Sequence, residues 1–295
     1  MAAVIIAPAE PAMPGSATRV RRILARDPLA IASLIVIGVL VLFAVAGPFI
    51  APYPEQGAGA SSVANRMLGP SQAHLFGTDE LGRDMFSRII IGAQGALGVA
   101  LLVVALAIGI GVPLGAIAGY RRGRIDAAIM RTTDLFLAFP PLLLAMAIVA
   151  ALGPGLDHAA LALAVSWWPW YARLQRGTAA SLRERPFIEA ARAAGVGDAA
   201  IIVRHIIPNS LGPILVQATT DIGTVILAAG GLAFLGLGAS PPAPDWGLLV
   251  AQGRTFILDQ WWLSAFPGLA IFVTVLAFNL LGDTLLDVLD PRRRR

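Results

Sequence analysis

The chain has 295 residues, of which 57% are hydrophobic and 14% are charged. Average soluble domains have roughly 45–50% apolar and about 25% charged residues, so this composition predicts a membrane protein with several spans. The sequence contains no cysteine and no lysine. This excludes disulfides, Cys-ligated metal sites and the lysine of a P-loop ATPase. The net charge of +4 comes from arginines whose placement follows the predicted topology, which argues against binding to nucleic acid.

The chain opens with a predicted cytoplasmic tail, residues 1–27. The first 18 residues are rich in alanine and proline, a composition that predicts disorder. Residues 28–50 form the first apolar stretch. It predicts a transmembrane helix, because about 20 residues cross the hydrocarbon layer. A signal peptide cleaved at Ala44-Val45-Ala46 is the alternative, but the stretch is longer than the usual apolar region of roughly 7–15 residues.

Five further stretches without charged residues complete the predicted spans. They cover residues 89–120, 135–156, 158–171, 222–244 and 260–282. The fourth span, 158–171, is short and crosses only if Arg173 and Arg176 extend toward the head groups. The fifth is expected to begin earlier, near Asn209. The predicted fold class is therefore an all-α integral membrane protein with six transmembrane helices.

The arginines predict the orientation of these spans. Eighteen of the 22 lie in the N-terminal tail, in or near the connections after the second and fourth spans, or after the sixth. Arginine-rich connections stay in the cytoplasm. Both termini are therefore predicted to be cytoplasmic, in the inner membrane of a bacterium. Residues 51–88 then form an extracytoplasmic loop, and residues 89–290 form a five-helix core.

The second span carries Gly111, Gly115 and Gly119 at four-residue spacing, beside Pro113. Small residues at this spacing let the backbone of another helix approach closely. We expect them to pack inside the bundle, and a hinge at Pro113 is the alternative.

The longest predicted cytoplasmic connection, residues 181–208, has the pattern of two short helices joined by a turn. Pro186 suits the first turn of a helix, and Gly195 supplies a helix stop because glycine tolerates positive φ. Asp198 is placed to cap a second helix over residues 199–206. A partly apolar hairpin of this kind fits a protein partner. A helix lying in the membrane interface and a plain connector are the alternatives.

Asp221 is the acidic residue expected inside a span, the fifth one. A carboxylate within the membrane is a functional candidate. The alternative is an interfacial residue paired with an arginine such as Arg173 or Arg176.

The hairpin resembles the EAA motif of the membrane subunits of binding-protein-dependent ABC importers. The matching residues, at the spacing of that motif, are Glu189, Ala190, Ala191, Gly195 and Pro208. The outer loop from His74 to Arg88 is similar to a signature of the dipeptide/oligopeptide/nickel permease family, in its "C"-type subunit with one N-terminal span ahead of the core. Its signature residues are Gly77, Thr78, Asp79, Gly82, Arg83 and Asp84. The resemblance extends from about residue 22 to residue 291.

The resemblance implies a type I ABC importer fold and a pore shared with a paralogous permease subunit. Two ABC ATPase subunits would bind ATP and magnesium, so this chain is expected to hold no metal or other cofactor and to catalyse no reaction. An extracytoplasmic solute-binding protein would deliver the solute. The 189–208 hairpin would dock on an ATPase subunit, and residues 71–88 would either receive the binding protein or brace the second span. The implied solute is a di- or oligopeptide, with nickel, glutathione or another small solute as alternatives.

Two other classes of function are rival hypotheses. An ATP-independent transporter or channel disagrees with the scarcity of charge inside the spans and with the hairpin. An integral-membrane enzyme would need a cluster of His, Asp or Ser side chains facing a cavity, and the sequence shows none.

Overall fold

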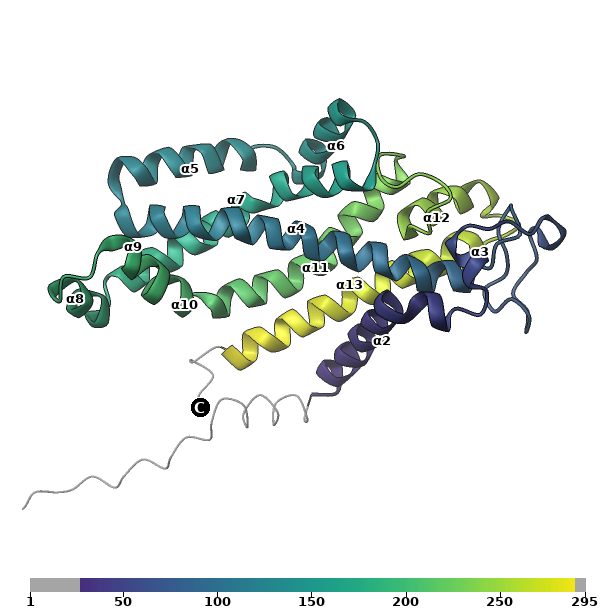
Figure 1. The fold of residues 1–295 in the computed structure, drawn as a ribbon, viewed down its shortest axis with the longest axis horizontal. Helices are drawn as coiled ribbons and strands as arrows, with labels where there is room; N and C mark the ends of the chain where they lie inside the picture. The colour runs from purple at the N-terminus through teal and green to yellow at the C-terminus, as the bar shows by residue number, and fades with distance from the viewer. Residues whose placement is uncertain (1–26, 290–295) are drawn as a thin grey trace, which may run out of the picture.

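The computed structural model describes residues 27–289, which fold into helices joined by loops (Figure 1). Within this range the β pairing is limited to one isolated bridge between Thr78 and Asp84. The all-α prediction is therefore confirmed for these residues. The predicted disorder of the N-terminal tail, and the four arginines at residues 292–295, fall outside the described part of the chain.

The longer helices are α2 (Pro28–Ile50), α4 (Met85–Arg121), α5 (Gly123–Leu137), α6 (Pro141–Leu152), α7 (Leu156–Arg183), α11 (Leu211–Phe234) and α13 (Trp262–Leu289). The shorter ones are α3 (Pro54–Ala58), α8 (Pro186–Ala193), α9 (Asp198–Ile201), a π-helix (Ile202–Ile206), α10 (Ile207–Asn209), α12 (Trp246–Gly253) and 3₁₀ turns at Val63–Asn65 and Arg254–Phe256. In Figure 1, α2 and α11 run toward the end that carries α3 and α12, while α4, α7 and α13 run away from it.

Four helices, α2, α4, α11 and α13, are long and apolar enough to cross a membrane on their own. α5 and α6 together have the apolar length for a fifth crossing, but they are bent by 83° against each other. The bend falls at Pro140-Pro141, because proline lacks a backbone N–H and disfavours helix in the residue before it. Residues 135–156, predicted as the third span, are therefore not one continuous helix.

α7 occupies the place of the predicted fourth span and is much longer than residues 158–171. Its 28 residues are long enough to cross a membrane. Asp157, Arg173 and Arg176 lower its apolar character, and it is not among the helices that are apolar enough to cross on their own. The described residues thus contain four strongly apolar spans, or five if the bent pair is one. The prediction of six rested on counting every stretch without charge as a crossing.

The most extensive helix contact joins α4 to α7, and the three spaced glycines lie within it. A Cβ atom added at Gly111, Gly115 or Gly119 would lie 2.3–2.5 Å from a backbone oxygen of α7, which is closer than real Cβ atoms come. The glycines therefore let the two backbones touch, as expected for small residues at this spacing. α4 continues through Pro113 as a single helix, so the packing interpretation is the one that the structure supports.

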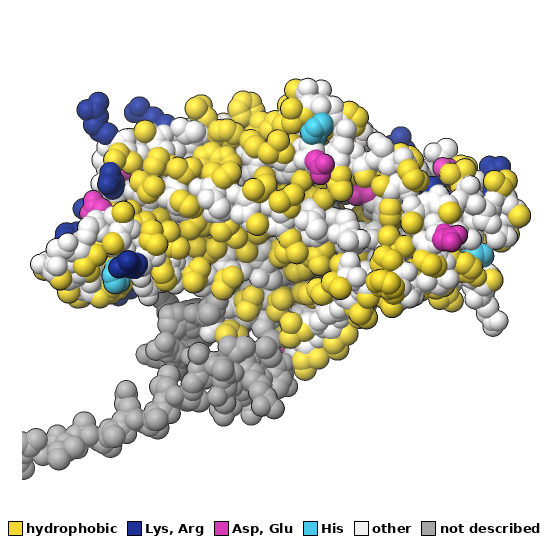
Figure 2. All heavy atoms as spheres, in the orientation of Figure 1, with side chains coloured by type: hydrophobic (Ala, Val, Ile, Leu, Met, Phe, Trp, Pro, Cys, Tyr) yellow, Lys and Arg dark blue, Asp and Glu magenta, His cyan; other side chains and the backbone are white. Residues whose placement is uncertain are grey.

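Buried side chains form two cores. The larger core fills the space between α4, α7, α11, α12 and α13. The smaller lies where α4 and α7 end against α8, α9 and the π-helix, and its members are Ala116, Tyr120, Ala179, Ile188, Ile201, Ile202 and Ile206. Figure 2 shows hydrophobic side chains over the middle of the visible face and charged side chains gathered mostly at its two ends. This distribution is the one expected of a protein that crosses a bilayer.

Candidate functional site

The hairpin predicted between the fourth and fifth spans is present as α8 and α9, and we call residues 186–201 the α8–α9 hairpin. Pro186 begins α8, as predicted. Gly195 has φ +78, and the amides of Gly195 and Val196 close the turn by donating to the carbonyls of Arg192 and Ala191. Glycine adopts this left-handed conformation without the strain that a side chain would add. The hairpin projects from the end of the molecule opposite α3 and α12 (Figure 1).

The second arm of the hairpin departs from prediction in two ways. Asp198 does not cap it, because Gly197 occupies the N-cap position and Asp198 is the first helical residue. The carboxylate of Asp198 instead accepts a hydrogen bond from the Tyr120 hydroxyl at 3.0 Å. The α-helix expected over residues 199–206 ends at Ile201 and gives way to a π-helix, after which Pro208 lies inside the short α10.

The motif residues of the hairpin are largely on its surface. Glu189, Ala190, Gly195, Asp198 and Pro208 are exposed, and Ala191 is half-buried. Glu189 lies in the first turn of α8, where a carboxylate interacts favourably with the helix dipole. Ile188, in contrast, is fully buried in the smaller core and anchors α8 to the bundle. Phe187 on α8 is apolar and 43% exposed, and Val203 on the π-helix that follows the hairpin is 62% exposed. The hairpin thus presents small and apolar side chains on a surface with no partner among the described residues.

The outer-loop signature is mostly buried and lies at the start of α4. Thr78, Asp79, Arg83 and Asp84 are each at most 6% exposed. Gly77 and Gly82 adopt positive φ in the turns, at +73 and +74. These are the turns that the sequence predicts around the two glycines.

Asp79 and Asp84 organise this loop through hydrogen bonds. Asp79 Oδ1 accepts from the backbone N–H groups of Leu81 and Arg83, both at 2.9 Å, while its Oδ2 accepts from Arg83 Nε at 2.6 Å. Asp84 Oδ2 accepts from the amide of Ser87 at 2.8 Å and so caps α4. The other oxygen, Oδ1, lies 2.9 Å from His74 Nδ1. The cap explains why α4 begins at Met85, four residues before the predicted start.

Arg88 connects the signature loop to a distant part of the chain. Its side chain is fully buried, and its Nη2 donates to the carbonyls of Pro242 and Ala243 at 3.3 Å each. Its Nε lies 3.8 Å from Asp79 Oδ2. The buried Arg88 therefore braces the start of the second span. Ser71, Gln72 and Leu75 of the same loop are exposed, so receipt of the binding protein by residues 71–88 stays a prediction.

Asp221 is 6% exposed on α11. Its Oδ1 accepts a hydrogen bond from Gln217 Nε2 at 3.0 Å. Tyr171 and Trp167 of α7 lie beside the carboxyl group, but Oδ2 has no hydrogen bond of normal geometry within the described residues. α7 and α11 therefore meet at a small polar site inside the bundle, which keeps Asp221 a functional candidate.

The predicted alternative for Asp221, an ion pair with an arginine, is wrong. Arg173 pairs with Asp134, and Arg176 donates two hydrogen bonds to Asp126, at 3.1 and 2.7 Å. Both acids belong to α5, so these arginines tie α5 to α7 rather than reaching α11.

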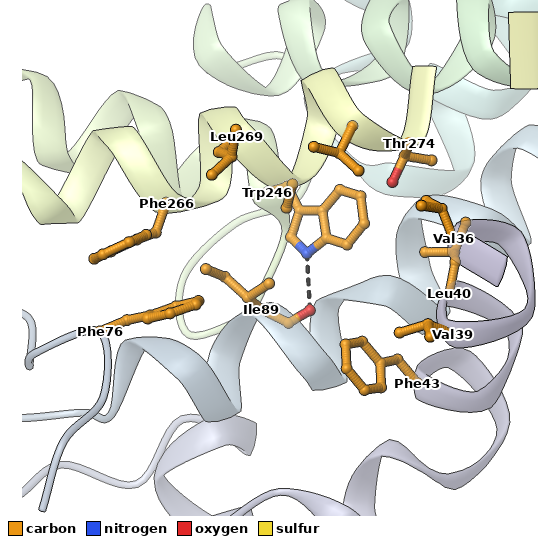
Figure 3. Close-up of a pocket in the computed structure, with 12 residues that line it drawn as sticks. Val36, Val39, Leu40, Phe43, Phe76, Ile89, Trp246, Phe266, Leu269 and Thr274 are labelled. Atoms are coloured by element: carbon orange, nitrogen blue, oxygen red, sulfur yellow. Dashed lines mark hydrogen bonds between the residues drawn. The ribbon is translucent and has the colours of Figure 1, made fainter. Parts of the chain in front are cut away.

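An apolar cavity of about 220 Å³ lies between α2, α4 and α13 (Figure 3). Phe43, Phe76 and Phe266 form part of its wall. The indole N–H of Trp246 is not free to bind an occupant, since its Nε1 donates a hydrogen bond to the carbonyl of Ile89 at 2.9 Å. The cavity therefore fits an apolar occupant and offers no charged side chain that would orient a charged solute.

Tyr120 was missed in the sequence, and Arg88 was included there only as the last residue of the outer loop. Tyr120 and Arg88 each contact residues more than 70 positions away, Asp198 in one case and Pro242 in the other. A tyrosine beside arginines at a span's end reads as an ordinary interfacial anchor. Among residues 27–289, no group of three or more His, Cys, Asp or Glu side chains is placed to hold a metal ion.

Apolar helices of membrane length, closely packed around glycines and joined by an exposed hairpin, define a helical membrane protein of the transporter class. The sequence comparisons give the family. The family described as "Binding-protein-dependent transport system inner membrane component" matches residues 111–295, and "N-terminal TM domain of oligopeptide transport permease C" matches residues 17–70. The chain belongs to the binding-protein-dependent transport system inner membrane components, as its EAA-like hairpin suggested.

Similar curated proteins cover most of the chain. The probable D,D-dipeptide transport system permease protein DdpC of Escherichia coli K12 is 46% identical over 266 residues, which are 90% of this chain and 88% of that protein. The dipeptide transport system permease protein DppC of Alkalihalophilus pseudofirmus is 46% identical over 273 residues, with 92% and 88% covered. The glutathione transport system permease protein GsiD of Escherichia coli O6:K15:H31 is 43% identical over 267 residues, with 90% and 88% covered.

The fold is also found among solved structures. A chain of the MetNI methionine ABC transporter, in an inward-facing conformation, superposes with a TM-score of 0.58. The match covers 70% of this chain and 98% of that chain, at 19% sequence identity. At this identity the similarity concerns the fold alone, which is that of a type I ABC importer permease.

Proposed function

We propose that this chain is one of two permease subunits of an ATP-driven importer of di- or oligopeptides, and that it forms half of the translocation pathway. A paralogous permease subunit would supply the other half. Two ABC ATPase subunits would bind ATP and magnesium, and an extracytoplasmic solute-binding protein would deliver the peptide. In this arrangement the chain itself catalyses nothing, and the free energy for transport enters through its partners.

The observation that carries this proposal is the exposed α8–α9 hairpin. It places Glu189, Ala190 and Gly195 on the surface while Ile188 anchors it to the bundle. Small side chains on a firmly anchored helix allow close docking in a groove of another protein. The sequence has no lysine for a P-loop of its own, in agreement with a motor on a separate subunit.

The proposed topology has six crossings with both termini in the cytoplasm. α5 and α6 would make the third crossing as a bent pair, and α7 would make the fourth, with Arg173 and Arg176 near the cytoplasmic head groups. Arginine enrichment in the predicted cytoplasmic connections supports this orientation. The hairpin then lies in the cytoplasm, and the signature loop at the start of α4 lies outside.

The proposed solute class rests on the relatives. Two of the similar permeases are described as serving dipeptide or D,D-dipeptide transport, and GsiD is described as serving glutathione, which is itself a small peptide. Nickel or another small solute is the second candidate. The low identity to the methionine transporter supports no assignment of solute.

The test is reconstitution of the complex. The chain carries an affinity tag and is co-expressed with its candidate partners, and the purified assembly is placed in liposomes with the binding protein. We expect an ATPase to co-purify, and ATP to drive uptake of a labelled dipeptide. Uptake without ATP, or purification without any ATPase, would contradict the proposal. Uptake of nickel with no uptake of dipeptide or glutathione would contradict the solute class alone.

A further inference from the structure

Tyr120 holds an unusual position at the base of the α8–α9 hairpin. It is the second-last residue of α4, yet it is only 4% exposed. Its hydroxyl donates to Asp198 Oδ1 at 3.0 Å. Two guanidinium groups lie over its ring, with the Cζ atoms of Arg192 and Arg183 at 5.6 and 5.9 Å from the ring centroid. These distances are those of cation–π contacts.

The partners of Tyr120 belong to three different elements. Arg183 ends α7, Arg192 lies on α8, and Asp198 begins α9. One side chain of α4 therefore contacts the end of α7 and both arms of the hairpin. Beneath it lies the smaller core, in which Ile188 and Ile201 of the hairpin are fully buried against α4 and α7. The hairpin is thus attached to α4 by an apolar core, a hydrogen bond and two ring contacts.

Ion pairs surround this attachment. Arg121 Nε lies 3.8 Å from Asp198 Oδ2, and Arg122 Nη2 lies 2.7 Å from Glu184 Oε1. These side chains are about half-exposed, so solvent screens the pairs and each adds little stability. The specific link between α4 and the hairpin is therefore the one made by Tyr120.

The covalent route from the hairpin to α11 is built differently. It passes first through the π-helix Ile202–Ile206 and then through the short α10. Ser210, with φ −103 and ψ 2, then breaks the helix ahead of α11. π-helical turns are rare and are found where helices deform, and Pro208 removes one backbone donor from this segment. The connection to α11 is thus a series of short elements, whereas α4 and α7 are long and touch along the glycines of α4.

We propose that Tyr120 is a positioning residue that fixes the α8–α9 hairpin to the α4–α7 pair, so that the three move as one body relative to α11. This inference rests on the proposed function, because it concerns how movement of a docked ATPase reaches the spans. Force applied to the hairpin then enters the bundle through Tyr120. The π-helix is held in the smaller core by Ile202 and Ile206, so α10 and the break at Ser210 absorb the change of angle toward α11. A transporter that alternates between two conformations needs both of them to be well packed, and a loosely attached hairpin would not provide this packing.

The first experiment is a double-mutant cycle in the reconstituted complex, with uptake and ATP hydrolysis measured together. Tyr120→Phe keeps the ring but loses the hydroxyl, and Asp198→Ala loses the acceptor. We expect each to lower the number of solute molecules moved per ATP at least threefold, and the double variant to be no worse than either. Asp198→Asn keeps an acceptor oxygen for the Tyr120 hydroxyl, so we expect it to couple better than Asp198→Ala. Additive effects, or normal coupling in Tyr120→Phe, would overturn the proposal.

The second experiment uses the absence of cysteine from the chain. Cysteines replace Arg121 and Asp198, whose side chains approach within 3.8 Å, and a short thiol-reactive linker joins them. Without the linker we expect weak coupling, because the acceptor for Tyr120 is gone. With the linker we expect coupling to recover, since the hairpin and α4 then move together. Loss of uptake on linking would show that the hairpin must turn against α4, which overturns the proposal.

These results are separable from the proposed function. If the unchanged complex purifies without an ATPase, the proposed function fails before any variant is measured. If the unchanged complex couples ATP hydrolysis to uptake while the variants behave normally, only the role of Tyr120 fails.

Discussion

Arg83 binds Asp79 at two points: its backbone N–H donates to Oδ1 at 2.9 Å and its Nε donates to Oδ2 at 2.6 Å. Both side chains are less than a tenth exposed. The pair holds the turn that leads into α4, next to the buried guanidinium of Arg88. Removal of Arg83 would leave the buried Asp79 carboxylate with only the more distant Arg88 guanidinium, which is less stable than the full set of contacts.

Arg83→Met is therefore expected to destabilise the protein by about 1.5–3 kcal/mol, since Asp79 Oδ2 loses its charged hydrogen bond at 2.6 Å and keeps only the Arg88 guanidinium, whose Nε lies 3.8 Å away. Thermal unfolding of the detergent-solubilised complex measures this loss. Glu80→Gln is the control, because the backbone carbonyl of Glu80, rather than its side chain, accepts from Arg66. Normal stability of Arg83→Met together with weaker affinity for the binding protein would instead assign this loop to docking.

Gly115→Ala tests the contact between α4 and α7. The added Cβ would lie 2.3 Å from the carbonyl oxygen of Ala172, so the two helices must separate. We expect a lower unfolding temperature and reduced uptake. Gly109→Ala is the matched control on the same helix, because its Cβ would meet nothing within 4 Å. An unchanged unfolding temperature for Gly115→Ala would contradict the close packing described here.

Gly195→Ala tests the turn of the hairpin. At φ +78 any side chain adds about 1–2 kcal/mol of backbone strain, although the surrounding space is open. We expect the turn to shift and uptake per ATP to fall, and Gly195→Asp to abolish uptake while the protein still inserts. Gly197→Ala is the control, since Gly197 has φ −68 and equally open space. Equal effects of the two alanine variants would show that the turn geometry is unimportant.

Asp245 provides a test by pH. Its Oδ1 caps α12 by accepting from the amide of Leu248 at 2.9 Å. Burial raises the pKa of the Asp245 carboxyl above its ordinary value of 3.8, and the hydrogen bonds from Leu248 and Gly247 oppose this only in part. The charged form is therefore the less stable one in the folded protein, and stability from this group increases as the pH falls through the raised pKa toward 3.8.

Asp245→Asn keeps a capping oxygen and removes the buried charge. At neutral pH we expect the variant to be as stable as the unchanged protein or more so, and this group's contribution to the pH dependence of unfolding to vanish. Asp245→Ala loses the cap and should lower stability by about 0.5–2 kcal/mol. A loss of stability in Asp245→Asn as large as in Asp245→Ala would show that the charge itself is needed.

Local chemistry made the hairpin predictable. Pro186 and Gly195 act on their own stretch of backbone, and both lie where the sequence places them. Close packing at the three glycines of α4 was also predictable, because glycines at four-residue spacing describe a helix surface without further context, but the sequence does not identify α7 as the partner. The same holds for the turns at Gly77 and Gly82.

The remaining features depend on contacts between distant residues or on competition between signals. The hydropathy of residues 135–156 suggests one helical span, but Pro140-Pro141 interrupts the helix. The backbone restriction imposed by the two prolines decides the local structure, although the surrounding residues are apolar. The sequence predicts Asp198 as a helix cap, yet its carboxylate accepts a hydrogen bond from Tyr120, which lies 78 residues earlier. Arg173 and Arg176 were expected near Asp221, and acids of α5 hold them instead. No local sequence pattern predicts these pairings between distant residues.

The central claim is that the α8–α9 hairpin is the surface on which the ATPase docks. A photoreactive amino acid at Ala190, which is exposed on α8, reports its neighbour directly when the assembled complex is irradiated in membranes. We expect a covalent product between this chain and the ATPase subunit, and we expect it to be lost when the ATPase is omitted. Attachment to lipid, or to the solute-binding protein added from outside, would contradict it.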